Sequence, residues 1–351
     1  MKDSLKITTY DIARELGISQ STVSRALNNS PLISQDVKEK ILNKAKEKGY
    51  LCNHLAKSLI TGKSGSIGIL ASGFQVDITG VKIIAIDDEI RRNGLHPHIA
   101  YTRSESELTV AKAIELIARG IDGLILLSPN ILNEKDILNY QSLIELKKPL
   151  VIITDNKLSL KCGQAIQTFD KAYENACFHL IDNKCEDIFV LWKNESLPEA
   201  LKNQRFEAII KYLKCSSRYT PQNILLIAES IFHPALNYKS DAICKSQSAK
   251  IETLLKRNSG RTGIICHNDM IAMQVLVTAL KLGMKIPDEL MITGYNNSSV
   301  SVYANPQLST VASQPEELAK VALELLCEQM SDCKFQERTA MVPCRFIHRE
   351  T

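Results

Sequence analysis

From Ser66 onward, short apolar runs alternate with segments of helical periodicity, and few folds accommodate this alternation. The apolar runs are IGIL (67–70), GLILL (123–127), LVII (150–153), IFVLW (188–192), ILLI (224–227), GIIC (263–266) and LMIT (290–293). The helical patterns lie near residues 80–92, 107–119, 135–146, 171–183, 198–213, 247–257, 269–282 and 315–330. Continuous apolar runs are typical of parallel strands that are buried on both faces. Because there are so many strands, we expect an α/β architecture with two doubly wound parallel sheets and a cleft between them.

The first 50 residues have a different pattern, that of three short helices. Thr8 and Ser19 can each cap a helix, and Gly17 separates the two helices. After a polar turn, Ser34 can cap a third helix that extends to about Lys48. Two short helices across a glycine turn, with a third helix behind them, form a helix-turn-helix architecture.

Positive charge is concentrated in the same module. The whole chain has a formal net charge of +4, but residues 1–64 alone hold eleven Lys/Arg against six Asp/Glu. A compact basic module is where a polyanion would bind. A solvated lysine-rich helix face would explain the charge alone, but its coincidence with the helix-turn-helix pattern favours DNA.

Other features of the chain exclude several classes of function. The ten cysteines form no CxxC pair, as is typical of reduced thiols in a cytosolic protein. No Cys/His group has metal-ligand spacing and the HPH sequence at 96–98 is expected to be incidental, so we expect no cofactor or metal. No run of 18 apolar residues occurs and residues 1–9 lack a secretory signal, so we expect a cytoplasmic protein without membrane contact. The sequence contains no GxxxxGK[ST], GxGxxG or GxSxG motif, so we expect no enzyme and no catalytic residues.

The stretch ITTYDIARELGISQSTVSRALNNSPLIS, followed by VKEKILNKAKEKGYLCNHLAKSLITGKSGSIGIL, resembles the LacI/GalR family of bacterial repressors. Sparser agreement continues in GIDGLILLS (120–128), in HND with MIAMQVLVTALKLGMKIPDELMITGYNN (267–297), in ANPQLSTV (304–311) and in VPCRFIHRET (342–351). The resemblance implies a three-helix headpiece, a hinge helix and a two-lobed, periplasmic-binding-protein-like domain. The loop ASGFQVDITG and the sequence Gly294-Tyr295-Asn296 depart from the family's usual cleft motifs, which leaves the ligand undefined.

We expect the following organisation: a DNA-binding headpiece over 1–51, a hinge helix and linker over 52–65, and an effector-binding and dimerisation domain over 66–351. Within that domain, we expect lobe 1 over about 66–166 plus 298–325, and lobe 2 over about 167–297 plus 326–351.

Candidate DNA contacts lie on the free face of the second helix. Gln20 and Arg25 can each make bidentate hydrogen bonds to base edges in the major groove, with Ser21 beside them. Expected phosphate contacts, which position the module without reading sequence, are Thr8, Tyr10, Thr22, Ser24 and Asn28. The alternative for all of them is an ordinary polar surface.

The hinge, CNHLAKSLITG (52–62), has only a short and weak helical pattern. By the resemblance, this helix enters the minor groove, and Leu59 matches a leucine that wedges between base pairs, a step that unstacks and bends the duplex. Asn53, Ala56 and Lys57 are expected to contact DNA with it. The alternative for Leu59 is packing against the sensor domain.

Candidate ligand contacts follow the strands. Asp269 and Asn296 lie just beyond GIIC and LMITGY, and ligands bind at the carboxyl ends of strands in doubly wound sheets. By the resemblance, the aspartate accepts hydrogen bonds from ligand hydroxyls; helix capping by Asn268 or Asp269 is the alternative. Further candidates are Phe74, Asp77 and Asp170, either Lys202 or Arg205 in the place of the family's ligand-binding arginine, and Trp192, which could stack on a sugar or belong to the core.

These features predict a homodimeric repressor that binds pseudo-palindromic operator DNA and a small-molecule effector. A carbohydrate is the expected effector because sugars are the commonest ligands of the family. A corepressor-type regulator that senses a nucleobase or another metabolite is the alternative. A free-standing solute-binding protein would share the two-lobed fold but would lack the basic headpiece.

Overall fold

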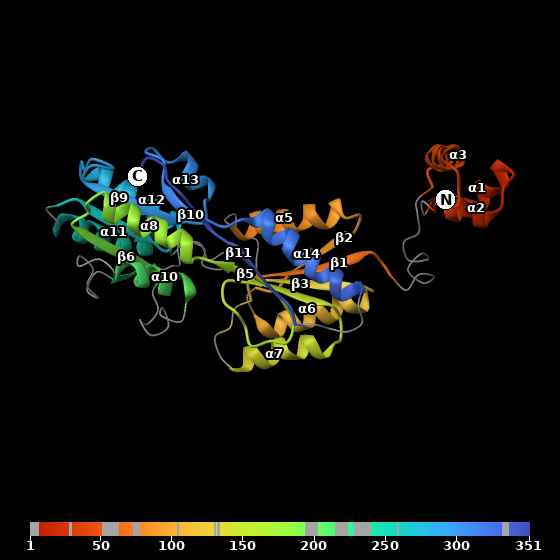
Figure 1. Ribbon diagram of the computed structural model, residues 1–351, viewed down its shortest axis with the longest axis horizontal. Helices are drawn as coiled ribbons and strands as arrows, with labels where there is room; N and C mark the ends of the chain where they lie inside the picture. Colours follow the sequence, from red (N-terminus) through yellow and green to blue (C-terminus); the bar gives the residue numbers. More distant parts are fainter. Residues whose placement is uncertain are drawn as a thin grey trace. The chain divides into compact units, whose positions relative to one another are not determined.

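The computed structural model describes residues 7–27, 30–50, 63–72, 78–103, 105–129, 131, 134–193, 203–214, 224–227, 240–257, 260–331 and 337–351. The chain divides into two compact units, Met1–Ser64 and Gly65–Thr351 (Figure 1).

The first unit contains α1 (Thr9–Leu16), α2 (Gln20–Leu27) and α3 (Gln35–Glu47). As predicted, Thr8 caps α1, and the side chain of Asp11 accepts a hydrogen bond from the backbone N–H of Thr8, which completes a capping box. Gly17 then ends α1 in the left-handed region at φ 65°, a conformation that costs glycine little. Ser34 occupies the expected cap position of α3, but its side chain makes no cap hydrogen bond.

A small core holds the three helices together. It consists of Ile12, Ala13, Val23, Ala26, Ile41 and Ala45, and Val23 and Ile41 are fully buried. The ion pair between Lys48 and Glu15, at 2.7 Å, joins the end of α3 to α1. Because the inward face of α2 is used for this core, its opposite face remains available to a partner.

The first sheet of the second unit has the order β11-β5-β4-β3-β1-β2, and all its strands are parallel. Its strands are β1 (Ser66–Ala71), β2 (His96–Tyr101), β3 (Gly123–Leu127), β4 (Leu150–Thr154), β5 (Gly163–Thr168) and β11 (Thr339–Pro343). The helices α5 (Ile78–Arg92) and α14 (Pro315–Ser331) cover one face (Figure 1). The helices α6 (Ser106–Ala118) and α7 (Glu134–Glu145) cover the other face.

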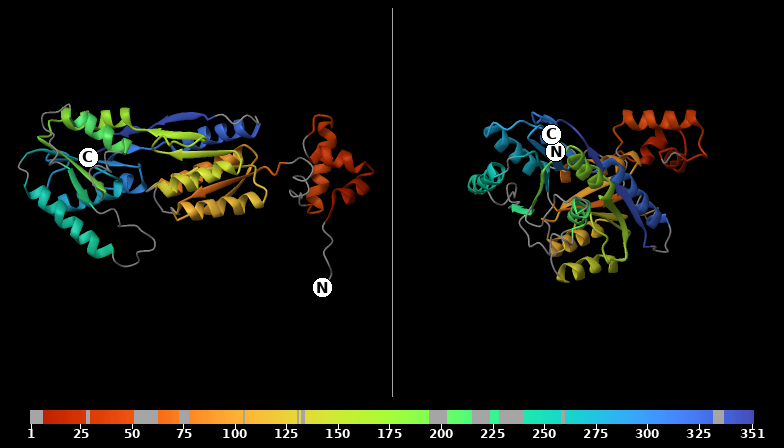
Figure 2. Two further views of the ribbon diagram at one scale, coloured as in Figure 1. Left: turned by 90° about the horizontal axis from the view of Figure 1, so that it is seen from below. Right: turned by 60° about the vertical axis from the view of Figure 1, so that its left-hand side comes forward.

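The second sheet has the order β12-β10-β9-β8-β6-β7 and is parallel except for β12. Its strands are β6 (Asp187–Lys193), β7 (Ile224–Ile227), β8 (Thr262–Cys266), β9 (Leu290–Tyr295), β10 (Ser309–Ala312) and β12 (Arg345–Ile347). Two cores flank it, one under α8 (Asp170–Asp182) and α10 (Gln204–Leu213), the other under α11 (Ser240–Arg257) and α12 (Asp269–Lys281). The short α13 (Ser299–Tyr303) follows β9, and Figure 2 shows the same two helix-covered sheets from two further sides.

Each of the seven apolar runs forms a strand, as predicted. The sequence pattern missed β2, β5, β10, β11 and β12. The strand β2 lies at an edge of its sheet and is mostly exposed, so it lacks an apolar run. The strand β5 is buried but contains two glutamines, and Gln164 satisfies its amide through backbone groups of Leu158 and Leu160.

The division into lobes differs from the expected boundaries after residue 297. The strand β10 pairs with β9 in the second sheet, whereas α14 packs over the first sheet along its whole length. The strand β11 then pairs with β5 in the first sheet, and β12 returns to the second. The chain crosses between the sheets near residues 169, 314 and 344, whereas the expected boundaries place the crossings near 167, 298 and 326.

The three crossings are tied to one another by hydrogen bonds. The amide N–H of Cys344 donates to the carbonyl of Thr168 at 2.8 Å. The side chain of Gln314 donates to the carbonyl of Pro343, and the hydroxyl of Ser313 donates to the side-chain carbonyl of Gln167. The two lobes are therefore joined by three chain segments that are hydrogen-bonded to one another, which we call the ribbon.

The half-buried imidazole of His179 on α8 makes the second unit sensitive to pH. Its ring centroid lies 4.3 Å from that of His348 and 5.6 Å from that of Phe346. Burial lowers the pKa of His179, and His348 and Arg261 lower it further against the opposing effect of Asp182. Because the folded protein favours neutral imidazole, this stabilisation is present above the ordinary pKa of histidine, about 6.5, and is lost as the pH falls below it.

We expect the melting temperature of the second unit to fall between about pH 8 and about pH 5, and the variant His179→Phe to reduce that fall. Phenylalanine keeps the ring contacts and removes the titrating nitrogen. Calorimetry across this pH range measures the effect, with His98→Gln on the exposed edge of β2 as the control. An equally steep fall in the wild type and in His179→Phe would contradict the assignment.

Candidate DNA-binding surface and effector site

The second helix of the first unit presents the predicted base-reading residues. Gln20, Ser21 and Arg25 are exposed on α2, opposite the buried Val23 and Ala26. The side-chain amide of Gln20 donates to the hydroxyl of Thr9 at 3.1 Å, which joins α2 to the start of α1. This face therefore carries hydrogen-bonding groups of the kind that read base edges.

The predicted phosphate contacts that the structure describes differ in their exposure and in the hydrogen bonds that they already make. Tyr10 is 67% exposed, so its phenol is accessible. The hydroxyls of Ser21 and Thr22 each lie 2.8 Å from that of Ser19, and Ser24 is partly buried. The hydroxyl of Thr8 already serves the capping box of α1.

Several predicted site residues lie outside the described part of the chain. They are Asn28, Asn53, Ala56, Lys57 and Leu59 for DNA, and Phe74, Asp77 and Lys202 for the ligand. Their contacts remain predictions.

Arg205 is the buried cation at the carboxyl ends of the strands in the second lobe. The residue is 5% exposed, and its guanidinium lies 3.6 Å from the ring centroid of Tyr295 and 5.1 Å from that of Trp192. One terminal nitrogen donates to the backbone carbonyl of His267, while the buried Nε has no hydrogen-bond partner. Such an arrangement leaves one donor of a charged group to be satisfied.

Aromatic rings enclose this guanidinium. Trp192 at the end of β6 is fully buried and meets the ring of His267 edge-on at 4.6 Å. Phe169 lies 6.0 Å from Tyr295 and 6.4 Å from Tyr173, and the buried hydroxyl of Tyr173 has no hydrogen-bond partner. Trp192 thus belongs to the core and also to the wall around Arg205, which combines the two alternatives for this residue.

Asp155, which directly follows β4, is a residue of the first lobe that influences Arg205. Burial by itself lowers the pKa of Arg205, but Tyr173, Tyr295 and Asp155 outweigh it, and the net shift is upward. The neighbouring Asn156 accepts a hydrogen bond through its side chain from the backbone N–H of Gln204 at 3.3 Å. The carboxylate of Asp155 in the first lobe therefore acts electrostatically on the guanidinium of Arg205 in the second lobe.

Asp269 lies just beyond the carboxyl end of β8 and Asn296 just beyond that of β9, as predicted, but Asp269 is turned inward. Asn296 is 7% exposed and adopts φ 110°. Asp269 is 1% exposed, and both its carboxylate oxygens accept hydrogen bonds from within the lobe. The cap of α12 is Asn268, whose side chain accepts from the backbone N–H of Ile271 at 3.0 Å.

Asp170 is not brought to this site. Its carboxylate accepts hydrogen bonds from Lys211 at 2.7 Å and from the hydroxyl of Tyr212 at 2.6 Å, and these bonds lower its pKa. The side chain of Asp170 is 60% exposed in this ion pair. The bonds to Lys211 and Tyr212 of α10 account for the direction of this side chain.

The sequence interpretation missed Asp155, His267, Tyr173 and Tyr295. A signal was available for three of them, since Asp155, His267 and Tyr295 lie at the end of β4, β8 or β9. The same rule had selected Asp269 and Asn296. Tyr173 lies within a helical pattern and gives no comparable signal.

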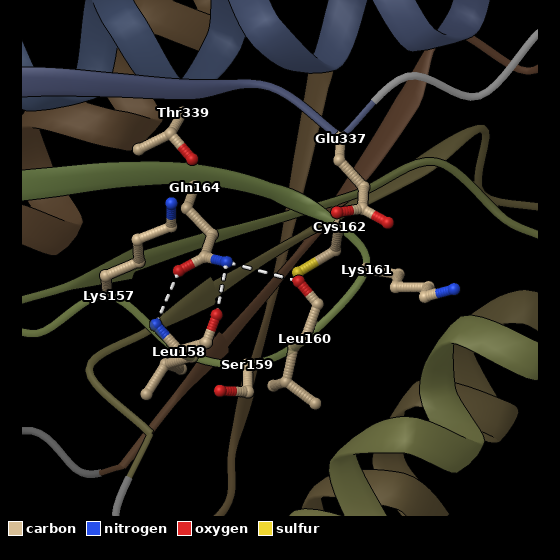
Figure 3. Close-up of a pocket in the computed structure, with 9 residues that line it drawn as sticks. All are labelled: Lys157, Leu158, Ser159, Leu160, Lys161, Cys162, Gln164, Glu337 and Thr339. Atoms are coloured by element: carbon tan, nitrogen blue, oxygen red, sulfur yellow. Dashed lines mark hydrogen bonds between the residues drawn. The ribbon is translucent and has the colours of Figure 1, made fainter.

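A separate surface pocket of about 480 Å³ lies at the amino end of β5 (Figure 3). Its lining residues are Lys157, Leu158, Ser159, Leu160, Lys161, Cys162, Gln164, Glu337 and Thr339. Figure 3 shows the Gln164 amide bound to the backbone of its own loop, and burial raises the pKa of Cys162 to about 12. This pocket lies at the strand end opposite to the one where doubly wound sheets bind ligands.

Within the described ranges, no group of three or more His, Cys, Asp or Glu residues could hold a metal ion. In the same ranges, no helix has the length and apolar character needed to cross a membrane.

Comparisons with known proteins agree with both units. Residues 8–53 match the family described as "Bacterial regulatory proteins, lacI family", and residues 178–351 match "Periplasmic binding protein-like domain". Catabolite control protein A of Staphylococcus aureus (strain N315) is 24% identical over 349 residues, 99% of each chain. The ribose operon repressor of Haemophilus influenzae is 24% identical over 344 residues, 98% of each chain.

Solved structures share the fold. The lac repressor dimer bound to operator and the anti-inducer ONPF has a TM-score of 0.77 at 20% identity, covering 98% of each chain. The transcriptional regulator CelR in complex with cellobiose has a TM-score of 0.65 at 16% identity, covering 98% of this chain and 99% of that one. The expected helix-turn-helix headpiece and two-lobed domain are thereby confirmed, and the matching relatives are regulators rather than enzymes. The chain thus combines an N-terminal domain that matches the LacI family of bacterial regulatory proteins with a periplasmic-binding-protein-like domain, and it is similar over its whole length to relatives named as regulators of this kind.

Proposed function

We propose that this regulator is a cytoplasmic homodimer that represses transcription and that a small polyhydroxyl effector, held between its lobes, sets its affinity for the operator. The observation that carries the effector site is the guanidinium of Arg205, buried among aromatic rings with its Nε unsatisfied. A buried donor of this kind favours a ligand that supplies an acceptor.

The charges around the cleft favour a neutral effector. Arg205 comes from the second lobe and Asp155 from the first, so their charges compensate one another. A sugar offers hydroxyls that both donate and accept, and its apolar face suits the rings of Tyr295 and Trp192. One relative is named a ribose operon repressor and one structural neighbour contains cellobiose, which supports the same ligand class.

The aromatic wall also supports a second candidate. Planar nucleobases stack on aromatic rings and on guanidinium planes, so a corepressor of this class fits the same cage. The remaining ligand contacts that we propose are Asn296, Phe74 and Asp77, with Arg205 rather than Lys202 as the basic contact.

A thermal-shift screen of sugars and nucleobases tests the site. A ligand at 100 times its Kd should stabilise the second unit by about 2.7 kcal/mol. We expect Arg205→Met, which keeps the apolar stem, to abolish that shift, while Lys211→Met on the same helix but paired with Asp170 keeps it. A full ligand-induced shift in Arg205→Met would contradict the proposed contact.

For DNA recognition, we propose that α2 enters the major groove and that Leu59 enters the minor groove at the operator centre. Arg25→Ala or Gln20→Ala should weaken operator binding by about 1–3 kcal/mol and relax the preference at one base position in each half-site. Selection from a randomised operator at fixed salt measures this preference. Arg14→Ala, which removes an exposed charge from α1, is the control, and unchanged selectivity in Arg25→Ala and Gln20→Ala would rule out base reading.

We propose that two copies associate through apolar side chains of the first lobe. Val81 and Ile84 on α5 are 46% and 57% exposed, and Ile99 and Tyr101 on β2 are 40% and 43% exposed. Exposed apolar side chains of this kind favour an interface, and two identical surfaces can pair about a twofold axis.

Sedimentation tests the dimer. We expect Ile84→Glu to produce a monomer and to weaken operator binding, because one headpiece contacts only one half-site. Ile114→Glu, at a similarly exposed position on α6, should remain dimeric. A tetramer in the wild type, or an unaltered dimer in Ile84→Glu, would contradict the proposed interface.

A further inference from the structure

Asp269 is the first residue of α12, and its carboxylate connects three parts of the second lobe. One oxygen accepts hydrogen bonds from the backbone N–H of Ser298 at 2.7 Å and from its hydroxyl at 3.0 Å. The other oxygen accepts from the hydroxyl of Thr310 at 2.7 Å. The carboxylate thereby joins α12 to the loop after β9 and to β10.

The loop after β9 has a costly backbone conformation. Asn296 has φ 110° and Asn297 has φ 53°, both in the left-handed region that favours glycine. Two consecutive residues of this kind persist only where their surroundings hold them. We refer to Asn296 and Asn297 as the corner.

Hydrogen bonds hold the corner from both sides. The backbone N–H of Asn296 donates to the carbonyl of Val311 at 2.9 Å, and that of Asn297 donates to the hydroxyl of Thr310 at 3.3 Å. Thr310 therefore accepts from the corner and donates to Asp269. Ser298, the next residue, is held by Asp269 directly.

The close approach of α12 to β9 requires a glycine at position 294. A Cβ placed on Gly294 would lie 2.1 Å from a carboxylate oxygen of Asp269, well inside any real contact distance. Gly294 therefore leaves the space in which the carboxylate sits, directly before the ring of Tyr295 that faces Arg205.

We propose that Asp269 is a positioning residue: its carboxylate fixes the corner so that Asn296 is presented to the effector. This inference rests on the proposed effector site and assigns Asp269 a role beyond the predicted contact with ligand hydroxyls. Both carboxylate oxygens are engaged within the lobe, and the residue is 1% exposed. The side chain acts through Ser298 and Thr310.

Two matched threonine variants test the proposal. Thr310→Val removes the hydroxyl that joins Asp269 to the corner, and Thr278→Val removes a buried hydroxyl on α12 that donates to the carbonyl of Gln274 at 2.8 Å. Hydrogen exchange by mass spectrometry reports the backbone amides of Asn297 and Ser298. Ribose and cellobiose are the titration probes, and Trp192, the only tryptophan of the chain, reports their binding by fluorescence.

We expect Thr310→Val and Asp269→Asn to raise exchange at Asn297 and Ser298 by about tenfold and to weaken probe binding by a similar factor. Thr278→Val should leave both quantities near the wild-type value, even where its melting temperature falls. Unchanged exchange in Thr310→Val, or equal losses of affinity in Thr310→Val and Thr278→Val, would overturn the positioning role. Failure of both sugars to bind the wild type would count against the proposed carbohydrate effector, and the exchange measurement would still decide the role of Asp269.

Discussion

The buried amide of Gln167 sits where the two lobes meet, and the relation between them depends on its hydrogen bonds. Gln167 is 1% exposed, its amide nitrogen donates to Asp155, and its carbonyl oxygen accepts from Ser313. A buried amide without partners would be costly, so these groups hold the first and second crossings together. Asp155 also faces Arg205, which connects the hinge to the cleft through one side chain. The lobes can therefore turn about this ribbon only by a motion that keeps or replaces these bonds.

The sequence predicted those elements whose own side chains carry the signal. Strands such as β3 and β4 are buried on both faces, so every residue in them is apolar and the run is visible. The edge strand β2 has no such requirement, and β5 hides two glutamines whose partners are backbone groups distant from the pattern. The return of β10 and β11 to different sheets was unpredictable for another reason, because strand pairing is a long-range property that local periodicity does not contain.

The candidate site was predicted in its location and only partly in its residues. The rule that ligands bind at the carboxyl ends of strands selected Asn296 correctly as a residue of that edge, but the rule says nothing about side-chain direction. Asp170 turns toward Lys211 and Tyr212, and Asp269 turns toward Ser298 and Thr310. A carboxylate near the start of a helix can accept hydrogen bonds from several donors in its own lobe. Only the three-dimensional arrangement shows which of these donors it pairs with.

The electrostatic attraction between Arg205 and Asp155, which come from different lobes, links the proposed effector site to the arrangement of the lobes. Each group is buried or partly buried, and separating an oppositely charged pair leaves both without compensation unless the ligand supplies new partners. A ligand with both donors and acceptors can compensate the two charges at once, whereas an apolar ligand cannot. Such a ligand stabilises only the lobe arrangement in which both contacts form, so its binding shifts the equilibrium between arrangements by the difference in affinity. Because Asp155 also accepts the hydrogen bond from Gln167, a ligand that alters the attraction between Asp155 and Arg205 acts directly on the chain segments that join the lobes.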